Sequence, residues 1–133
     1  MQKFIFWTGV YNVVAGFTFL FPPIALFLGV TLPDSNVWVW TVAVAIIYLG
    51  IAMIMSSRDL NNRATFVYWE GLLRLVAFFL FSGFGFFGGL GTIMGILGIV
   101  DLFIGIVYLI GLPKAMHASP KELLFDQIIT QNG

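Results

Sequence analysis

The 133-residue chain contains no cysteine and only one histidine, His117. Without cysteine it can form no disulfide, no thiolate metal site and no thiol nucleophile. A zinc site needs several side-chain ligands, and His117, in the polar tail, offers no histidine ligand for a zinc or haem within the apolar segments. We therefore expect no metal site and no cofactor held by this chain. A serine nucleophile is also unsupported, because His117 lies in the polar tail, away from the apolar segments.

Charge is scarce as well. Charged residues make up 9% of the chain, hydrophobic residues 60%, and the formal net charge is zero. A soluble domain is about 25% charged and about 45–50% apolar. The lack of a basic patch argues against nucleic acid as a partner. The composition instead predicts an integral membrane protein with one compact domain, whose main partner is the lipid bilayer.

Four apolar segments are long enough to span a membrane, since a hydrocarbon layer of about 30 Å takes about 20 helical residues. We predict an all-α, four-helix transmembrane bundle in residues 1–113. The predicted spanning helices cover about 4–21, 37–55, 64–81 and 91–112.

The segments between and after these spans are short. The polar stretch 56–63 is predicted to be a loop, and Pro113 is predicted to end the last span, because proline lacks a backbone donor. Residues 114–133 form a tail that contains the capping-box sequence Ser-Pro-Lys-Glu. This sequence predicts a short amphipathic helix over about 120–129, lying on the membrane surface.

Basic residues predict the orientation in the membrane. The loops over 22–37 and 82–91 contain no lysine or arginine. The opposite side carries Lys3, Arg58, Arg63, Lys114 and Lys121. Because basic residues are enriched on the cytoplasmic side of a membrane, both termini are predicted to be cytoplasmic. The expected location is a bacterial inner membrane.

Two stretches of the chain resemble each other. Residues 7–19 (WTGVYNVVAGFTF) and 69–81 (WEGLLRLVAFFLF) share six identical positions, and residues 46–54 align more weakly with 99–107. Each half then contains two spans, so both halves enter the membrane from the same side. The pattern predicts two parallel helical hairpins related by a pseudo-twofold axis along the membrane normal.

Glu70 and Arg74 lie one helical turn apart inside an apolar span, so their side chains point to the same side. Ionisable groups inside a membrane are costly and mark a functional site by default. The repeat aligns Thr8 with Glu70 and Asn12 with Arg74. The two predicted stripes continue through Ala15 and Phe19 in the first half, and through Ala77 and Phe81 in the second.

Depth along the helices groups the polar residues further. At 1.5 Å per residue, one polar residue of each span lies roughly 13–17 Å from the same end. The predicted polar layer contains Asn12, Tyr48, Arg74 and Asp101. A second layer, nearer the cytoplasm, is predicted to contain Thr8, Glu70 and Tyr108.

Two interpretations of these layers stay open. In the structural one, Arg74 bridges Glu70 and Asp101, and Asn12 and Tyr48 complete the hydrogen bonds; such a network fixes helix register. In the functional one, Arg74 holds an anionic or carbonyl head group of a lipophilic ligand, and Asp101 or Glu70 exchanges a proton.

Small residues form a separate stripe on the last span, including one G-x-x-x-G pair: Gly91, Gly95, Gly98 and Gly105. Such motifs permit close contact between helices. The stripe predicts either packing inside the bundle, against the first or third span, or a homo-oligomer contact.

The third span contains Tyr-Trp-Glu-x3-Arg-Leu over 68–75, and the fourth contains an acidic residue. With two tandem hairpins, this pattern resembles the DoxX-like superfamily of small four-helix membrane proteins. The resemblance implies either binding of a quinone or lipid, or an accessory role in a respiratory-type membrane complex whose partner subunit holds the cofactor. A sterol-isomerase-like enzyme is a more distant likeness, and Arg74 would oppose the cationic intermediate of such an enzyme.

Overall fold

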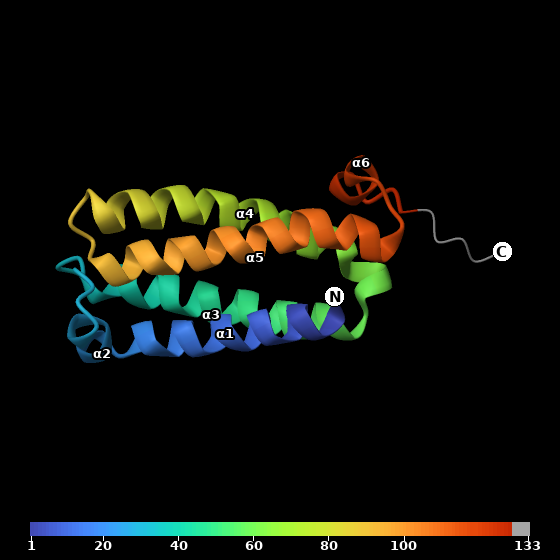
Figure 1. Ribbon diagram of the computed structural model, residues 1–133. Helices are drawn as coiled ribbons and strands as arrows, with labels where there is room; N and C mark the ends of the chain where they lie inside the picture. Colours follow the sequence, from blue (N-terminus) through green and yellow to red (C-terminus); the bar gives the residue numbers. More distant parts are fainter. Residues whose placement is uncertain (129–133) are drawn as a thin grey trace.

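A computed structural model describes residues 1–128, and all regular structure within them is helical (Figure 1). The elements are α1 (Gln2–Leu20), α2 (Pro22–Phe27), α3 (Asn36–Arg58), α4 (Leu60–Phe86), α5 (Thr92–Met116) and α6 (Pro120–Leu124). Among these residues, four helices (α1, α3, α4 and α5) are long and apolar enough to cross a membrane. The prediction of an all-α protein with four helices of membrane-spanning type is therefore confirmed.

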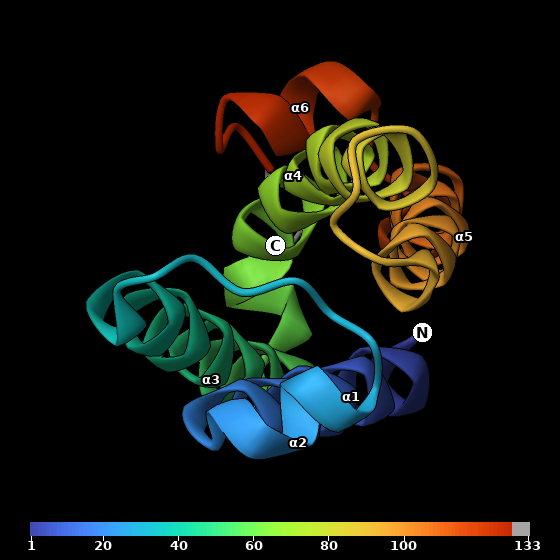
Figure 2. The ribbon, with the colours of Figure 1, turned by 90° about the vertical axis from the view of Figure 1, so that its left-hand side faces the viewer.

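The four long helices form two hairpins. α1 packs closely along α3, and α4 packs closely along α5, whereas the two hairpins contact each other much less. Viewed along the helices, the α1–α3 pair and the α4–α5 pair form separate layers (Figure 2). The chain therefore has close packing within each hairpin and a looser boundary between them.

Glycine allows the close packing within the hairpins. A Cβ atom added at Gly9 of α1 would lie 2.7 Å from the carbonyl oxygen of Gly50 in α3, so the two backbones are in direct contact. In the other hairpin, Gly95 and Gly98 of α5 face Phe86 and Ser82 of α4. Three members of the predicted glycine stripe, Gly95, Gly98 and Gly105, thus face α4, the third span, in line with the interpretation as internal packing.

The predicted loop over 56–63 is wrong. α3 continues through Arg58, α4 begins at Leu60, and Asp59 alone separates them. The hydroxyl groups of Ser56 and Ser57 donate to backbone carbonyls one turn back, at 2.7 Å each, which keeps these polar residues helical. The amide of Asn62, in the first turn of α4, donates to the Asp59 carboxylate at 3.0 Å.

Two other helix ends also lie further along the chain than predicted. α4 extends to Phe86, and in this additional part the Ser82 hydroxyl donates to the Gly95 carbonyl of α5 at 3.0 Å. α5 continues past Pro113 to Met116. A proline removes one backbone donor, and α5 tolerates that loss close to its end, where the Pro113 carbonyl accepts from Ala118 at 3.1 Å.

The two ends of the bundle are closed in different ways. At the end that carries the N-terminus, buried side chains from both hairpins form a continuous core that includes Ile5, Met53 and Tyr108. At the other end, α2 and the following loop bring Ala25 and Val30 against Met94. These two ends are called the tail end and the loop end below.

The loop end is held together by backbone contacts. The Thr31 amide donates to the Leu90 carbonyl at 2.9 Å, which joins the α2–α3 loop to the α4–α5 turn. Gly91 has φ 112°, a conformation that favours glycine, and a Cβ atom there would collide with the Gly29 carbonyl. The two connections therefore cover this end of the bundle.

The capping box of the tail is present. Ser119 accepts from the Glu122 amide at 3.2 Å, and the Glu122 carboxylate accepts from the Ser119 amide at 2.6 Å. α6 has five residues and is shorter than predicted; residue 129 lies outside the described residues. The Trp69 indole of α4 donates to the Leu124 carbonyl at 3.0 Å and ties α6 to the bundle.

The contact of Gly9 with Gly50 gives a stability prediction. Gly9→Ala is expected to destabilise the protein by about 1–3 kcal/mol, the usual penalty for overpacking. Gly83→Ala is the control, because Gly83 is in α4 and a Cβ atom there has nothing within 4 Å. Thermal unfolding in detergent measures both; equal midpoints for the two variants would contradict the close contact of α1 with α3.

The capping box gives a pH prediction. The Ser119 amide lowers the pKa of the Glu122 carboxyl below its usual value. The contribution of this bond to α6 is therefore full above the unfolded pKa of about 4.3, and it is lost as pH falls through the lowered pKa. The Trp69 indole N–H resonance should shift on acidification as α6 loosens, and Glu122→Gln should remove most of that shift. An unchanged pH profile in Glu122→Gln would refute this.

Candidate functional site

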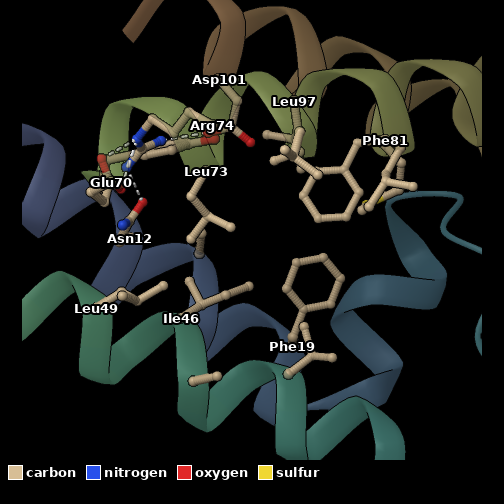
Figure 3. Close-up of a pocket in the computed structure, with 18 residues that line it drawn as sticks. Asn12, Phe19, Ile46, Leu49, Glu70, Leu73, Arg74, Phe81, Leu97 and Asp101 are labelled. Atoms are coloured by element: carbon tan, nitrogen blue, oxygen red, sulfur yellow. Dashed lines mark hydrogen bonds and ion pairs between the residues drawn. The ribbon is translucent and has the colours of Figure 1, made fainter. Parts of the chain in front are cut away.

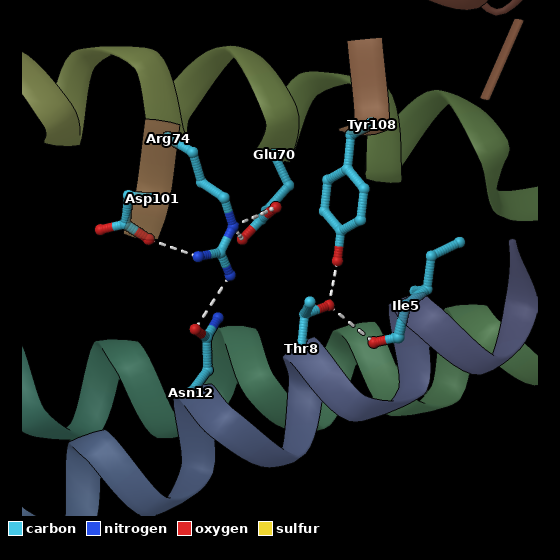
Figure 4. A network of polar contacts seen from close by, with 7 residues as sticks. All are labelled: Ile5, Thr8, Asn12, Glu70, Arg74, Asp101 and Tyr108. Atoms are coloured by element: carbon cyan, nitrogen blue, oxygen red, sulfur yellow. Dashed lines mark hydrogen bonds and ion pairs between the residues drawn. The ribbon is translucent and has the colours of Figure 1, made fainter. Parts of the chain in front are cut away.

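The buried guanidinium of Arg74 lies among polar side chains of α1, α4 and α5 (Figure 4). Nε of Arg74 lies 2.8 Å from one oxygen of Glu70 and donates to the other at 3.0 Å. Nη1 pairs with Oδ1 of Asp101, and Nη2 donates to Oδ1 of Asn12 at 2.9 Å. Each guanidinium nitrogen thus has an acceptor, and these come from α4, α5 and α1. The structure brings together the residues that the structural interpretation placed around Arg74, apart from Tyr48.

A second polar contact joins the hairpins about one turn closer to the tail end. The Thr8 hydroxyl donates to the Ile5 carbonyl at 2.9 Å and bonds with the Tyr108 hydroxyl. Because Thr8 has one hydrogen to give, Tyr108 is the donor in their bond. Thr8 and Tyr108 meet as predicted, whereas Glu70, assigned to the same layer, turns to Arg74.

Tyr48 does not join either layer, so its predicted position is corrected. It is 70% exposed on the outer surface of α3. Ile46, two residues earlier, faces the interior instead. Two residues correspond to about 200° around a helix. An error of two residues in the weak alignment of α3 with α5 therefore places Tyr48 on the opposite face of α3.

A cavity of about 350 Å³ lies between the hairpins, next to the charged residues (Figure 3). This volume falls within the range of about 300–1,000 Å³ that is common for small-molecule sites. Its polar lining is Asn12, Glu70, Arg74 and Asp101, with Tyr11 beside them. Its other walls are apolar: Ala15, Phe19, Val42, Ala45, Ile46, Leu49, Leu73, Val76, Ala77, Leu80, Phe81, Met94 and Leu97.

The cavity is open to the side, between α3 and α4. Its lining includes residues of these two helices that are about half exposed: Val42 at 49%, Leu73 at 49%, Val76 at 53% and Leu80 at 50%. These residues face the region that acyl chains would fill around a membrane-spanning bundle. At the loop end, by contrast, Phe19 and Phe81 pack against the buried cluster that contains Ala25.

The predicted stripes account for much of the cavity wall. Ala15, Phe19, Ala77 and Phe81 line it, together with the polar residues of their stripes. The α3 wall, from Val42 to Leu49, was missed, because α3 is apolar on every side and its periodicity indicates no inward face. Tyr11, which also lines the cavity, was not predicted, although its neighbour Asn12 was.

The charged layer contains more negative groups than positive groups. Glu70 and Asp101 face one guanidinium, so the formal charge of the three groups is −1. Within residues 1–128, no group of three histidine, cysteine or acidic residues is arranged to hold a metal. The arrangement can hold a polar head group by hydrogen bonds, with an apolar body in the remaining cavity.

Comparison of the chain with protein-family models, with curated proteins and with solved structures gives no match in any of the three.

The network gives a stability prediction. Arg74→Met leaves two buried carboxylates without a partner and should destabilise the fold by about 3–5 kcal/mol. The triple variant Glu70→Gln, Arg74→Met, Asp101→Asn should recover much of that loss, since no buried charge remains. Arg58→Ala, at an exposed position, is the control. Detergent-based unfolding measures all three; a triple variant no more stable than Arg74→Met would contradict this account.

Proposed function

We propose that this chain is a small integral membrane protein that binds a lipophilic small molecule, quinone-like or lipid-like, between its two hairpins. One observation carries the proposal: an apolar cavity of about 350 Å³ ends at the Arg74 network and opens sideways between α3 and α4. A purely structural network needs no such cavity, because apolar side chains would fill the space beside it.

The position of the network supports a deep site. Arg74 lies fourteen residues from the start of α4 and twelve from its end, and Asn12 is similarly central in α1. From Arg74 to Phe81 the cavity extends about 10 Å along the helix axis. A ligand would therefore place its head near the middle of the bilayer and its body toward Phe19 and Phe81.

A duplicated hairpin is part of the proposal. Ile5, Thr8, Gly9 and Asn12 of α1 are buried, and so are the aligned residues of α4: Val67, Glu70, Gly71 and Arg74. For α3 and α5 the burial pattern favours a new register, in which Gly50 matches Gly105 and Met53 matches Tyr108.

Membership of the DoxX-like superfamily, cytoplasmic termini and a bacterial inner membrane are also part of the proposal, and they rest on sequence patterns. The same holds for a position of α6 on the membrane surface.

An accessory subunit of a larger membrane complex is the second candidate. It is favoured by the complete pairing of Arg74 with three protein side chains and by large exposed side chains such as Trp7, Phe79 and Phe103. An isomerase-like enzyme has less support. Tyr108 is fully buried and bonded to Thr8, and neither Tyr108 nor Tyr48 lines the cavity.

Filling the cavity tests the binding function. Ala77→Trp should occupy the space beside Phe81 without changing the charged layer. Native mass spectrometry of protein purified in one detergent should give an added small-molecule mass for wild type and lose it in Ala77→Trp. Val44→Trp is the control, because Val44 is 58% exposed and does not line the cavity. It should keep the added mass.

The alternatives give different results. The same added mass in wild type and Ala77→Trp would place the bound molecule outside the cavity and overturn the proposal. Bare protein in all three samples, even after incubation with a total membrane lipid extract, would also overturn it. Copurification of further subunits with bare protein would then favour the accessory role.

A further inference from the structure

The group available to a ligand in the cavity is the carboxylate of Asp101. Its Oδ1 atom bonds Arg74, and the other oxygen makes no hydrogen bond within residues 1–128. Figure 3 shows this second oxygen turned away from Arg74, on the side of Leu97. The Asp101 side chain is 12% exposed, against 5% for Arg74 and 4% for Glu70, so Asp101 is the most accessible member of the ion pairs.

Arg74, the residue expected to hold a head group, is already occupied. Its three nitrogen atoms bond Glu70, Asp101 and Asn12. Glu70 has both oxygens within 3.0 Å of the Arg74 Nε atom. A ligand that bound Arg74 would have to displace one of these partners and leave a buried polar group unpaired, which is costly. A ligand that bound the accessible carboxylate oxygen of Asp101 would displace none of these partners.

Hydrogen-bond chemistry then selects the head group. An ionised carboxylate oxygen only accepts hydrogen bonds, so its partner must donate one. The layer already has a formal charge of −1, so an anionic head would add a second uncompensated negative charge in a low-dielectric place. Fatty-acid and phosphate anions are therefore disfavoured.

The route into the cavity also disfavours a cation. The sideways opening is rimmed by apolar side chains such as Val42, Leu73 and Val76. An ammonium group would have to leave water and pass this rim to reach the middle of the bilayer, which is costly. A hydroxyl group makes the same passage at lower cost and still donates to Asp101.

We infer that the cavity selects an uncharged, hydroxyl-bearing amphiphile, a lipophilic alcohol or phenol, whose O–H donates to Asp101. This inference rests on the proposed binding function and makes it more specific. If the ligand is quinone-like, the reduced form with its phenolic hydroxyls is the one that binds, because the oxidised form has no donor to offer.

The test uses four probes with the same apolar tail: dodecanol, dodecyl methyl ether, dodecyl sulfonate and dodecylamine. Wild-type protein in phosphatidylcholine nanodiscs receives each probe at the same mole fraction of lipid, and native mass spectrometry measures occupancy. Dodecanol should bind at least about tenfold more tightly than the ether, as a hydrogen bond to a charged group implies. The sulfonate and the amine should bind more weakly than dodecanol.

Asp101→Asn supplies the decisive variant. Its amide oxygen can keep the bond to Arg74 while its N–H group faces the cavity, so the variant presents a donor in place of an acceptor. The preference for dodecanol over the ether should fall by about tenfold or reverse. If the preference for dodecanol over the ether were the same as in wild type, Asp101 would not be the residue that recognises the head group, and the inference would be overturned.

The outcomes distinguish failure of this inference from failure of the proposed binding function. Equal binding of all four probes by wild type, lost in Ala77→Trp, would retain the cavity as a binding site and overturn the head-group selection. Tightest binding of dodecylamine or of the sulfonate would overturn it too. Absence of all four probes from wild type would overturn both proposals. If Asp101→Asn fails to fold, the order of the four probes on wild type alone decides.

Discussion

One buried guanidinium, that of Arg74, links the two halves of this protein. Two of its acceptors, Glu70 and Asp101, lie in its own hairpin, and the third, Asn12, lies in the other. Within each hairpin, glycine backbones pack directly. Among the described residues, side-chain bonds of Arg74 with Asn12 and of Tyr108 with Thr8 join the two hairpins, and the Thr31–Leu90 backbone bond joins them at the loop end. Away from water, such bonds have no solvent competitor, and their geometry fixes the relative depth of the helices. The cavity lies between the packed tail end and the packed loop end, where side chains of the two hairpins do not fill the space between them.

The sequence predicted the interior better than the connections. The four long apolar helices and the stripes through Asn12 and Arg74 followed from composition and from helical periodicity, which depend on local residue order. The loop over 56–63 was wrong because polarity suggested a break, whereas serine hydroxyls can bond the preceding turn and stay helical. Pro113 was overvalued as a helix stop, since its effect depends on how close the helix end is.

The candidate site was predictable in its chemistry and not in its shape. Glu70, Arg74 and Asp101 are conspicuous among apolar neighbours, so their meeting could be expected from charge alone. Tyr48 was misplaced because an apolar helix offers no reliable register. The accessible oxygen of Asp101, and the completed bonds of Arg74, depend on side-chain geometry across α1, α4 and α5, which no single-sequence pattern encodes.

Coverage of the loop end affects which concentration of a ligand, in water or in lipid, would set the occupancy of the cavity. The Thr31–Leu90 bond and the cluster around Ala25 close the cavity on that side, and a packed core closes the tail end. Under the proposed function, a molecule would reach the cavity from within the lipid, through the opening between α3 and α4. Its occupancy would then depend on its mole fraction in the bilayer, so dilution in water would leave it unchanged while dilution with lipid would empty the site. Such a protein would respond to the composition of its membrane, independently of the surrounding solution.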